Sequence, residues 1–135
     1  MNIVRDILRR NINPLSSDSK LGDAVDQLLS ANVSGLPVVD DHQQLVGFLS
    51  EFDCIPHLIS GSYHCDSRLH VKDVMHESPL SVSPEDSIID IAQKMSGNKP
   101  KVYPVIENGR LIGIVARQDI LRALNQSLKS CVSYA

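Results

Sequence analysis

Two aspartates stand at matching places in the chain, Asp53 and Asp119, 66 positions apart. Each follows a short apolar stretch and falls in the first turn of an expected helix. A carboxylate can accept hydrogen bonds from both hydroxyls of a vicinal diol, and a helix N-terminus attracts phosphate. The alternative is capping, because Ser50 and Asp53 have the spacing of a capping box. Capping explains Asp119 less well, since Ala116 holds the serine's place and has no hydroxyl.

Basic side chains are concentrated in the second half of the chain. Residues 1–67 carry 4 basic and 9 acidic side chains, whereas residues 68–135 carry 9 basic and 7 acidic ones. An anionic ligand is therefore expected near the second half, although a surplus of solvated charges gives the same count. The candidates for this positive charge are Lys99, Lys101, Arg110 and Arg117.

Composition predicts a single soluble globular unit. The chain has 135 residues, of which 42% are hydrophobic and 21% charged, close to the average for folded domains. A formal charge of −3 argues against nucleic acid as the main partner. No apolar run is long enough to cross a membrane, and none at the N-terminus is typical of a signal peptide. Three cysteines without a secretion signal favour free thiols in the cytoplasm.

The positions of the two aspartates are part of a longer internal repeat. Several short segments recur in the same order at a spacing of 65 to 67 positions, which indicates two copies of one unit. The matching pairs are 14–16 and 79–81, 21–23 and 88–90, 36–40 and 103–107, and 45–49 and 111–115.

Hydrophobic periodicity changes in the same order within each copy. The first copy predicts helices at 21–32 and 51–60 and strands at 36–39 and 45–49. The second predicts helices at 87–96 and 117–128 and strands at 102–106 and 111–115, with one further short strand per copy at 15–17 and 80–82. We therefore expect an α+β fold of two β-α-β-β-α copies related by a pseudo-twofold. The expected boundaries are 1–62, a connector at 63–70, 71–128 and a tail at 129–135.

These two copies resemble a tandem pair of CBS domains, also called a Bateman module. The resemblance rests on residues 33–40 and 45–53 in the first copy and on 74–75, 104–105 and 111–119 in the second. It implies a stand-alone pair that forms homodimers and offers two clefts for adenosine-containing ligands. In that family the aspartate binds the ribose hydroxyls, a preceding Ser or Thr contacts ribose or phosphate, and the other copy contacts adenine.

The resemblance assigns candidate ligand-binding residues to each cleft. Ser50 and Asp53 would form the first cleft, closed by Ser78 and by residues 99–103 of the second copy, which include Lys101, Val102 and Tyr103. The residues of the second cleft would be Ile114, Ala116, Arg117 and Asp119, closed by Ile12, Asn13, Val33 and Ser34.

Three functions remain open at this stage. The first is a regulatory module that senses AMP, ADP, ATP or a related adenosyl compound, with no required cofactor and an unidentified regulated protein. The second is a structural or interaction homodimer with vestigial clefts, for which Ala116 is the main argument. The third is a metal or redox sensor built from Cys54, His57, His64 and Cys65, although we expect no metal site. The familiar catalytic motifs are missing from the sequence, so we expect no enzyme.

Overall fold

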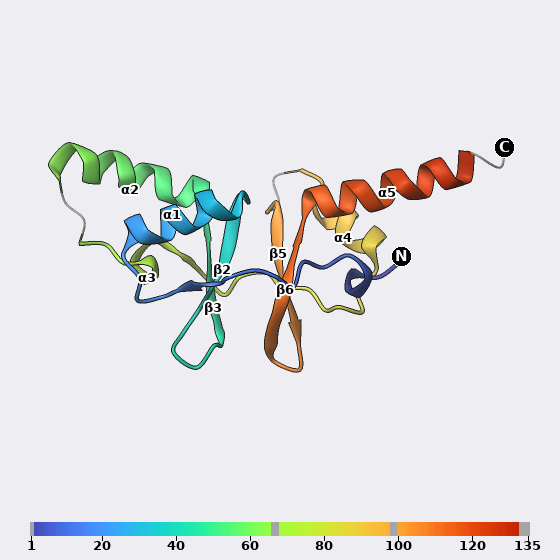
Figure 1. Cartoon of the computed structure of the whole chain (residues 1–135), viewed down its shortest axis with the longest axis horizontal. Coiled ribbons are helices and arrows are strands. Elements are labelled where there is room, and N and C mark those ends of the chain that lie inside the picture. The colour runs from blue at the N-terminus through green and yellow to red at the C-terminus, as the bar shows by residue number, and fades with distance from the viewer. Residues whose placement is uncertain (1, 66–67, 98–99, 133–135) are drawn as a thin grey trace.

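The computed structural model describes residues 2–65, 68–97 and 100–132. Figure 1 shows two units side by side, with the strands of both in the middle and the helices on the outer flanks. Strand β2 of one unit contacts β5 of the other, and the expected α+β pair is confirmed. The elements are η1 (Val4–Asp6), β1 (Leu15–Ser16), α1 (Leu21–Ala31), β2 (Gly35–Val39), β3 (Leu45–Ser50), α2 (Glu51–His64), α3 (Val71–Val74), β4 (His76–Glu77), α4 (Ile88–Lys94), β5 (Val102–Glu107), β6 (Arg110–Ala116) and α5 (Arg117–Val132).

The first unit is built on a four-stranded sheet with the order β1-β2-β3-β4. Strand β1 pairs parallel to β2, whereas β2 with β3 and β3 with β4 are antiparallel. All five residues of β2 are buried, as expected for a short apolar central strand. Strand β4 was not predicted, because two residues are too few to show a period.

The second unit repeats this arrangement in reduced form. Strands β5 and β6 form an antiparallel pair, and single-residue bridges extend it on both sides. Val82 bridges Val105 in parallel, in the place that β1 takes beside β2, and Arg9 bridges Ile114 in antiparallel, in the place of β4. The strand expected at 80–82 is therefore reduced to Val82. The matching neighbours on both sides reflect the expected pseudo-twofold.

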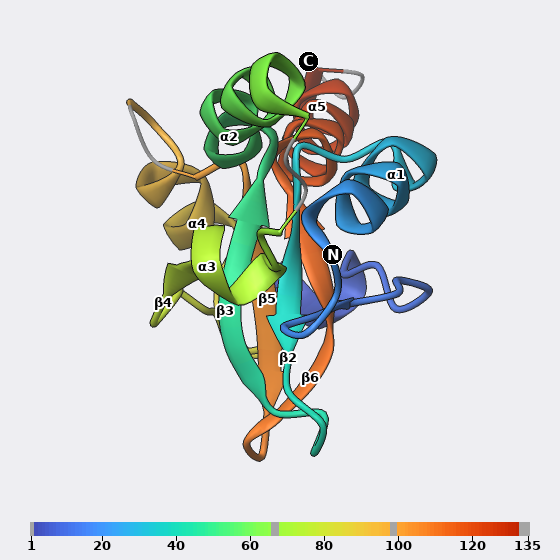
Figure 2. The same cartoon turned by 90° about the vertical axis from the view of Figure 1, so that its left-hand side faces the viewer.

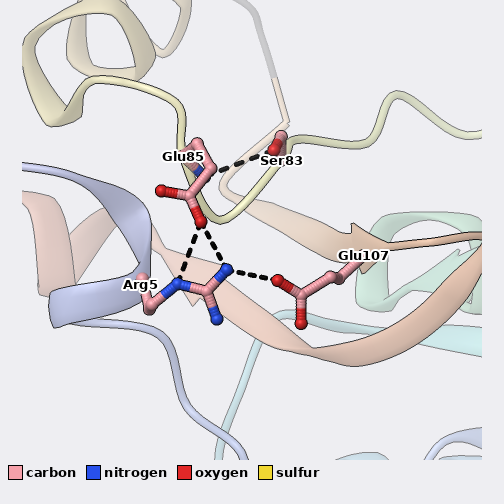
Figure 3. Close-up of polar contacts among 4 residues, drawn as sticks. All are labelled: Arg5, Ser83, Glu85 and Glu107. Atoms are coloured by element: carbon pink, nitrogen blue, oxygen red, sulfur yellow. Dashed lines mark hydrogen bonds and ion pairs between the residues drawn. The ribbon is translucent and has the colours of Figure 1, made fainter.

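The N-terminal segment crosses over to pack on the second unit, on the right of Figure 1. Val4 of η1 is fully buried in the core of that unit, among residues that include Val82 and Ile91. Arg5 binds both Glu85 and Glu107, which fastens η1 to the second unit (Figure 3). The second core therefore depends on residues from the start of the chain.

Helix α3 comes from the start of the second copy but packs on the first unit. Val71 is fully buried in the first core, and its amide donates to the carbonyl of Ser19 at 2.9 Å. The carboxylate of Asp73 accepts from the amide of His70 at 2.8 Å and caps the single turn. Sequence periodicity did not predict α3, because four residues are too few to show an amphipathic face.

Helices α2 and α5 run further than expected, and α4 is shorter. Helix α2 continues to His64 rather than ending near residue 60, and Cys65 closes it with a φ of 53°. Helix α5 reaches Val132, four residues past its expected end, whereas α4 ends at Lys94. Across the described residues, we find no helix long and apolar enough to cross a membrane.

A small apolar cluster joins the two units between their sheets. Val102, Ile114 and Ala116 from the second unit pack with Ile12, Val33 and Phe48 from the first. Two clefts are lined by residues of this cluster together with the starts of α2 and α5.

Candidate functional site

The first candidate aspartate lies where β3 ends and α2 begins. Ser50 is the N-cap of α2, and its hydroxyl oxygen accepts from the amide of Asp53 at 3.2 Å. The Asp53 carboxylate in turn accepts from the Ser50 amide at 3.2 Å and the Ser50 hydroxyl at 2.8 Å. The capping interpretation is therefore correct. It leaves one carboxylate oxygen, Oδ1, directed to other partners.

Asp53 also faces a cleft of about 860 Å³ between the two units. The Nε2 atom of His76 lies 3.1 Å from Asp53 Oδ1, and the His76 side chain is 72% exposed. The cleft combines two carboxylates and two serine hydroxyls with apolar and cationic side chains. Its lining residues are Ser34, Phe48, Ser50, Glu51, Phe52, Asp53, Ile55, His76, Gly97, Pro100, Lys101, Val102 and Arg117.

A smaller apolar pocket of about 220 Å³ adjoins this cleft. Phe48, His76, Pro100 and Val102 line both spaces. Ser78 lines only the smaller pocket, with Pro79, Leu80 and Pro104. The two spaces together are lined by apolar side chains, a carboxylate at Asp53 and the cations of Lys101 and Arg117.

The structure brings most of the residues predicted for the first cleft together. Ser50, Asp53, Lys101 and Val102 line the cleft, and Ser78 lines the adjoining pocket. Tyr103 does not, because its side chain is 2% exposed in the core of the second unit. Burial also raises the pKa of the Tyr103 hydroxyl. Lys99 lies outside the described residues.

The second cleft is smaller, at about 290 Å³, and its aspartate is not among the residues that line it. Val33, Ser34, Ala116 and Arg117 line it as predicted, together with Arg9, Asn32, Lys101, Val102, Gln118 and Leu121. Asp119 is 5% exposed and lies beneath Arg9 rather than in the lining.

Three further residues predicted for the second cleft do not line it. Ile114 is fully buried in the cluster between the units, and Ile12 packs against that cluster. Asn13 is exposed, and its carbonyl accepts from the side-chain amide of Gln27 at 2.9 Å.

Two cationic side chains stand between the clefts and line both of them. These are Lys101, just before β5, and Arg117, the first residue of α5. The Arg117 amide donates to the Lys101 carbonyl at 2.8 Å, and its guanidinium donates to the carbonyl of Met95 at 3.2 Å. These contacts hold the positive charge where the two units meet.

Sequence reasoning missed several residues of the clefts. Phe48 alternates with the fully buried Leu49 along β3, so period-two alternation could have placed it on the other face of the strand. Arg9 and His76 occupy matching repeat positions, 67 apart, and an alignment of the copies could have found them. Pro100 had been expected to close the first cleft and does line it.

The cysteines and histidines considered for a metal or redox site, Cys54, His57, His64 and Cys65, lie in helix α2 and at its end. Within the described ranges, no three His, Cys, Asp or Glu side chains gather as metal ligands would. Cys54 is 3% exposed. Burial, with smaller contributions from Asp53 and Glu51, raises the pKa of its thiol to about 11. Such a thiol is a poor nucleophile near neutral pH.

Comparison with known proteins adds a family match. A family model for the CBS domain matches residues 4–60 and again residues 71–126. The chain is 30% identical to CBSX2, a chloroplastic CBS domain-containing protein of Arabidopsis thaliana, over 87% of this chain and 60% of that protein. It is 29% identical to MJ1225 of Methanocaldococcus jannaschii over 90% of this chain and 42% of that protein. The chain thus spans about half the length of these relatives.

Solved structures agree with the sequence matches. The structure of CBSX2 in complex with AMP superposes with a TM-score of 0.79 and 30% identity, covering 93% of this chain and 98% of that one. The CBS domain pair of MJ0100, in complex with 5-methylthioadenosine and S-adenosyl-L-methionine, gives a TM-score of 0.73 at 25% identity, covering 93% and 97%. Both proteins hold adenosyl compounds.

Proposed function

The chain belongs to the CBS-domain family, and we propose that it is a regulatory module that binds an adenosine-containing nucleotide in the Asp53 cleft. Membership of the family does not by itself identify the ligand, because proteins with one fold bind many different ligands. The side chains that line the cleft limit which ligands fit.

The observation that carries the proposal is the set of groups that line the first cleft and the pocket beside it. Phe48, Pro100 and Val102 offer apolar surface for a purine ring. Asp53 can accept from both ribose hydroxyls, as charge-assisted hydrogen bonds. Lys101 and Arg117 offer positive charge for phosphate or for a ligand carboxylate. These three kinds of group suit the base, the ribose and the phosphate of AMP, and the ligands named for CBSX2 and MJ0100 support this choice.

Binding would be coupled to regulation because the cleft is shared between the copies. Ser50 and Asp53 come from the first copy, whereas Lys101 and Arg117 come from the second. A bound nucleotide would therefore tie the two copies together and favour one arrangement of them. A partner that distinguishes this arrangement would detect occupancy. In this account the protein has no catalytic role and requires no cofactor.

We propose that the module works as a homodimer. Helix α2 exposes Phe52, Ile55, Ile59 and Tyr63, and α5 exposes Leu121, Leu124, Leu128 and Val132. Both stripes have helical spacing, and the two helices lie on the same side of the molecule (Figure 2). Two equal stripes related by the pseudo-twofold suit a self-complementary contact with a second copy.

We further place the protein in the cytoplasm. Cys54, Cys65 and Cys131 are all free thiols, which suits a reducing compartment.

A thermal-shift panel with AMP, ADP, ATP, S-adenosylmethionine and NAD tests the proposed function. A ligand at 100 times its Kd adds about 2.7 kcal/mol to stability, which raises the Tm of a chain of this size by several degrees. We expect such a shift with at least one compound and its loss in Asp53→Asn. Asp23→Asn is the matched control, because Asp23 is an exposed acidic residue in the first turn of α1.

A flat panel with the folded wild-type protein would contradict nucleotide sensing. It would favour the alternative, an interaction homodimer whose clefts no longer bind.

A further inference from the structure

Besides Ser50 and Ala116, the two clefts differ at a further matching pair of repeat positions, Arg9 and His76. Arg9 bridges Ile114 on β6, and His76 pairs with Phe48 on β3. Phe48 and Ile114 are themselves matching positions, 66 apart. The backbone therefore delivers a basic side chain to the same place beside each aspartate, and only the type of side chain differs.

At the second cleft this side chain covers the carboxylate. Arg9 Nε lies 3.1 Å from Oδ1 and 3.0 Å from Oδ2 of Asp119. The same carboxylate accepts from the Ala116 amide at 2.9 Å and from Arg122 at 3.4 Å. The Asp119 side chain is 6% exposed. A guanidinium is permanently charged and well suited to hold a carboxylate, so a ribose would have to displace it.

At the first cleft the carboxylate is covered less, because the Asp53 side chain is 13% exposed. His76 makes a single contact with Asp53, at 3.1 Å, and is 72% exposed, so it can move aside without leaving a packed position. Unlike Asp119, Asp53 is part of the cleft lining. An imidazole is also charged only when protonated, so it competes less strongly than a guanidinium for the carboxylate.

The two clefts also share the cationic side chains that would bind an anionic group of a ligand. Lys101 and Arg117 line both, so a phosphate in one cleft takes up the charge that a second phosphate would need. The second cleft has about 290 Å³, against about 860 Å³ for the first. The larger volume and the less covered carboxylate favour the first cleft, and the shared cations favour one bound nucleotide at a time.

We propose that Arg9 acts as a built-in competitor that holds Asp119 and keeps the second cleft closed to nucleotide. The chain then binds one nucleotide, at Asp53. This inference rests on the proposed function, because it concerns which of the two clefts works. It assigns Arg9 a specificity-determining role that follows from its repeat position and its contacts.

Exchanging the two side chains tests the proposal, with AMP as the probe and calorimetric titration of the full chain as the measurement. In His76→Arg an arginine faces Asp53, and we expect AMP affinity to fall by about tenfold to a hundredfold. In Arg9→His with Asp53→Asn the second carboxylate is released while the first cleft is disabled, and we expect AMP to bind at Asp119 and this binding to be lost again when Asp119→Asn is added. Arg10→His and His42→Arg are charge-matched controls at exposed positions and should bind as the wild type does.

The outcomes separate this inference from the function on which it rests. Two AMP sites in the wild-type chain, or binding that survives Asp53→Asn and is lost in Asp119→Asn, would overturn the role of Arg9 and leave nucleotide binding intact. If Arg9→His fails to fold by circular dichroism, His76→Arg decides, because unchanged AMP affinity there would overturn the proposal. No AMP binding by the wild type or any folded variant would overturn the proposed function, and this inference with it.

Discussion

Asp53 has two tasks that its surroundings make compatible. Oxygen Oδ2 completes the cap of α2 through the amide and hydroxyl of Ser50, while Oδ1 faces His76 at 3.1 Å. Capping and ligand binding were rival interpretations of the same sequence pattern, and the geometry allows both. The cap fixes the position of the carboxylate before a ligand arrives, which lowers the cost of ordering it.

Cys54, the next residue, illustrates how burial suppresses side-chain reactivity. Because the pKa of its thiol is raised to about 11, the reactive thiolate is scarce at pH 8 and increases only as the pH approaches that value. We expect iodoacetamide at pH 8 to modify the exposed Cys65 and Cys131 well before Cys54. Mass spectrometry of peptides from the folded protein measures this. Equal labelling of all three cysteines would contradict the burial of Cys54.

At the scale of elements, the crossing of η1 onto the second unit depends on charge as well as packing. Arg5 is held between Glu85 and Glu107 (Figure 3). Its hydrogen bond lowers the pKa of the Glu107 carboxyl, and the same contacts raise the pKa of Arg5. A carboxyl with a lowered folded-state pKa stabilises the fold above its unfolded pKa, and the effect is lost as the pH falls through the folded value.

The substitution Glu107→Gln tests this link. We expect a lower Tm than the wild type at pH 7, because the Arg5 contact loses its charge on one side. The difference should narrow as the pH falls through the lowered folded-state pKa of Glu107, because the wild-type carboxyl is then also protonated. Melting curves followed by circular dichroism at pH 7 and pH 3 measure it. A Tm difference that is the same at both pH values would rule out the ionic contribution.

Elements with a clear period were predicted from the sequence, and the short ones were not. The repeat placed α1, β2, β3, β5 and β6 to within a residue or two of their observed bounds. Helix α3 and strand β4 have four and two residues, and tertiary contacts rather than local pattern define them. Helix α2 runs past its expected end at Ser60 to His64, where Cys65 closes it in a left-handed conformation that the apolar period does not reveal.

The residues of the candidate site also fall into those that the sequence predicted and those that it did not. Residues inside the repeated motif, Ser50 and Asp53, were placed in the first cleft from the sequence alone. Tyr103 was assigned to the cleft, but alternation along β5 turns its ring into the second core. The sequence did not predict the contact between Arg9 and Asp119, because the two residues lie 110 positions apart. The N-terminal segment brings Arg9 to Asp119 by packing on the second unit.

For the whole molecule, the exposed apolar stripes of α2 and α5 predict self-association. We expect Ile59→Lys combined with Leu128→Lys to convert a dimer into a monomer, because both positions become charged within the buried contact. Size-exclusion chromatography with light scattering measures the mass. Ile89→Lys is the matched control, since Ile89 is 60% exposed on α4. A wild-type monomer, or a double variant that remains dimeric, would show that these stripes do not form the contact.

The central claim is that the cleft between the two copies holds a nucleotide on Asp53. The most direct measurement is the electron density of AMP in crystals of the full chain grown with it. We predict both ribose hydroxyls on the Asp53 carboxylate, adenine against Phe48 and Pro100, and phosphate toward Lys101 and Arg117. AMP seated on Asp119, or an empty Asp53 cleft in crystals saturated with AMP, would contradict the account.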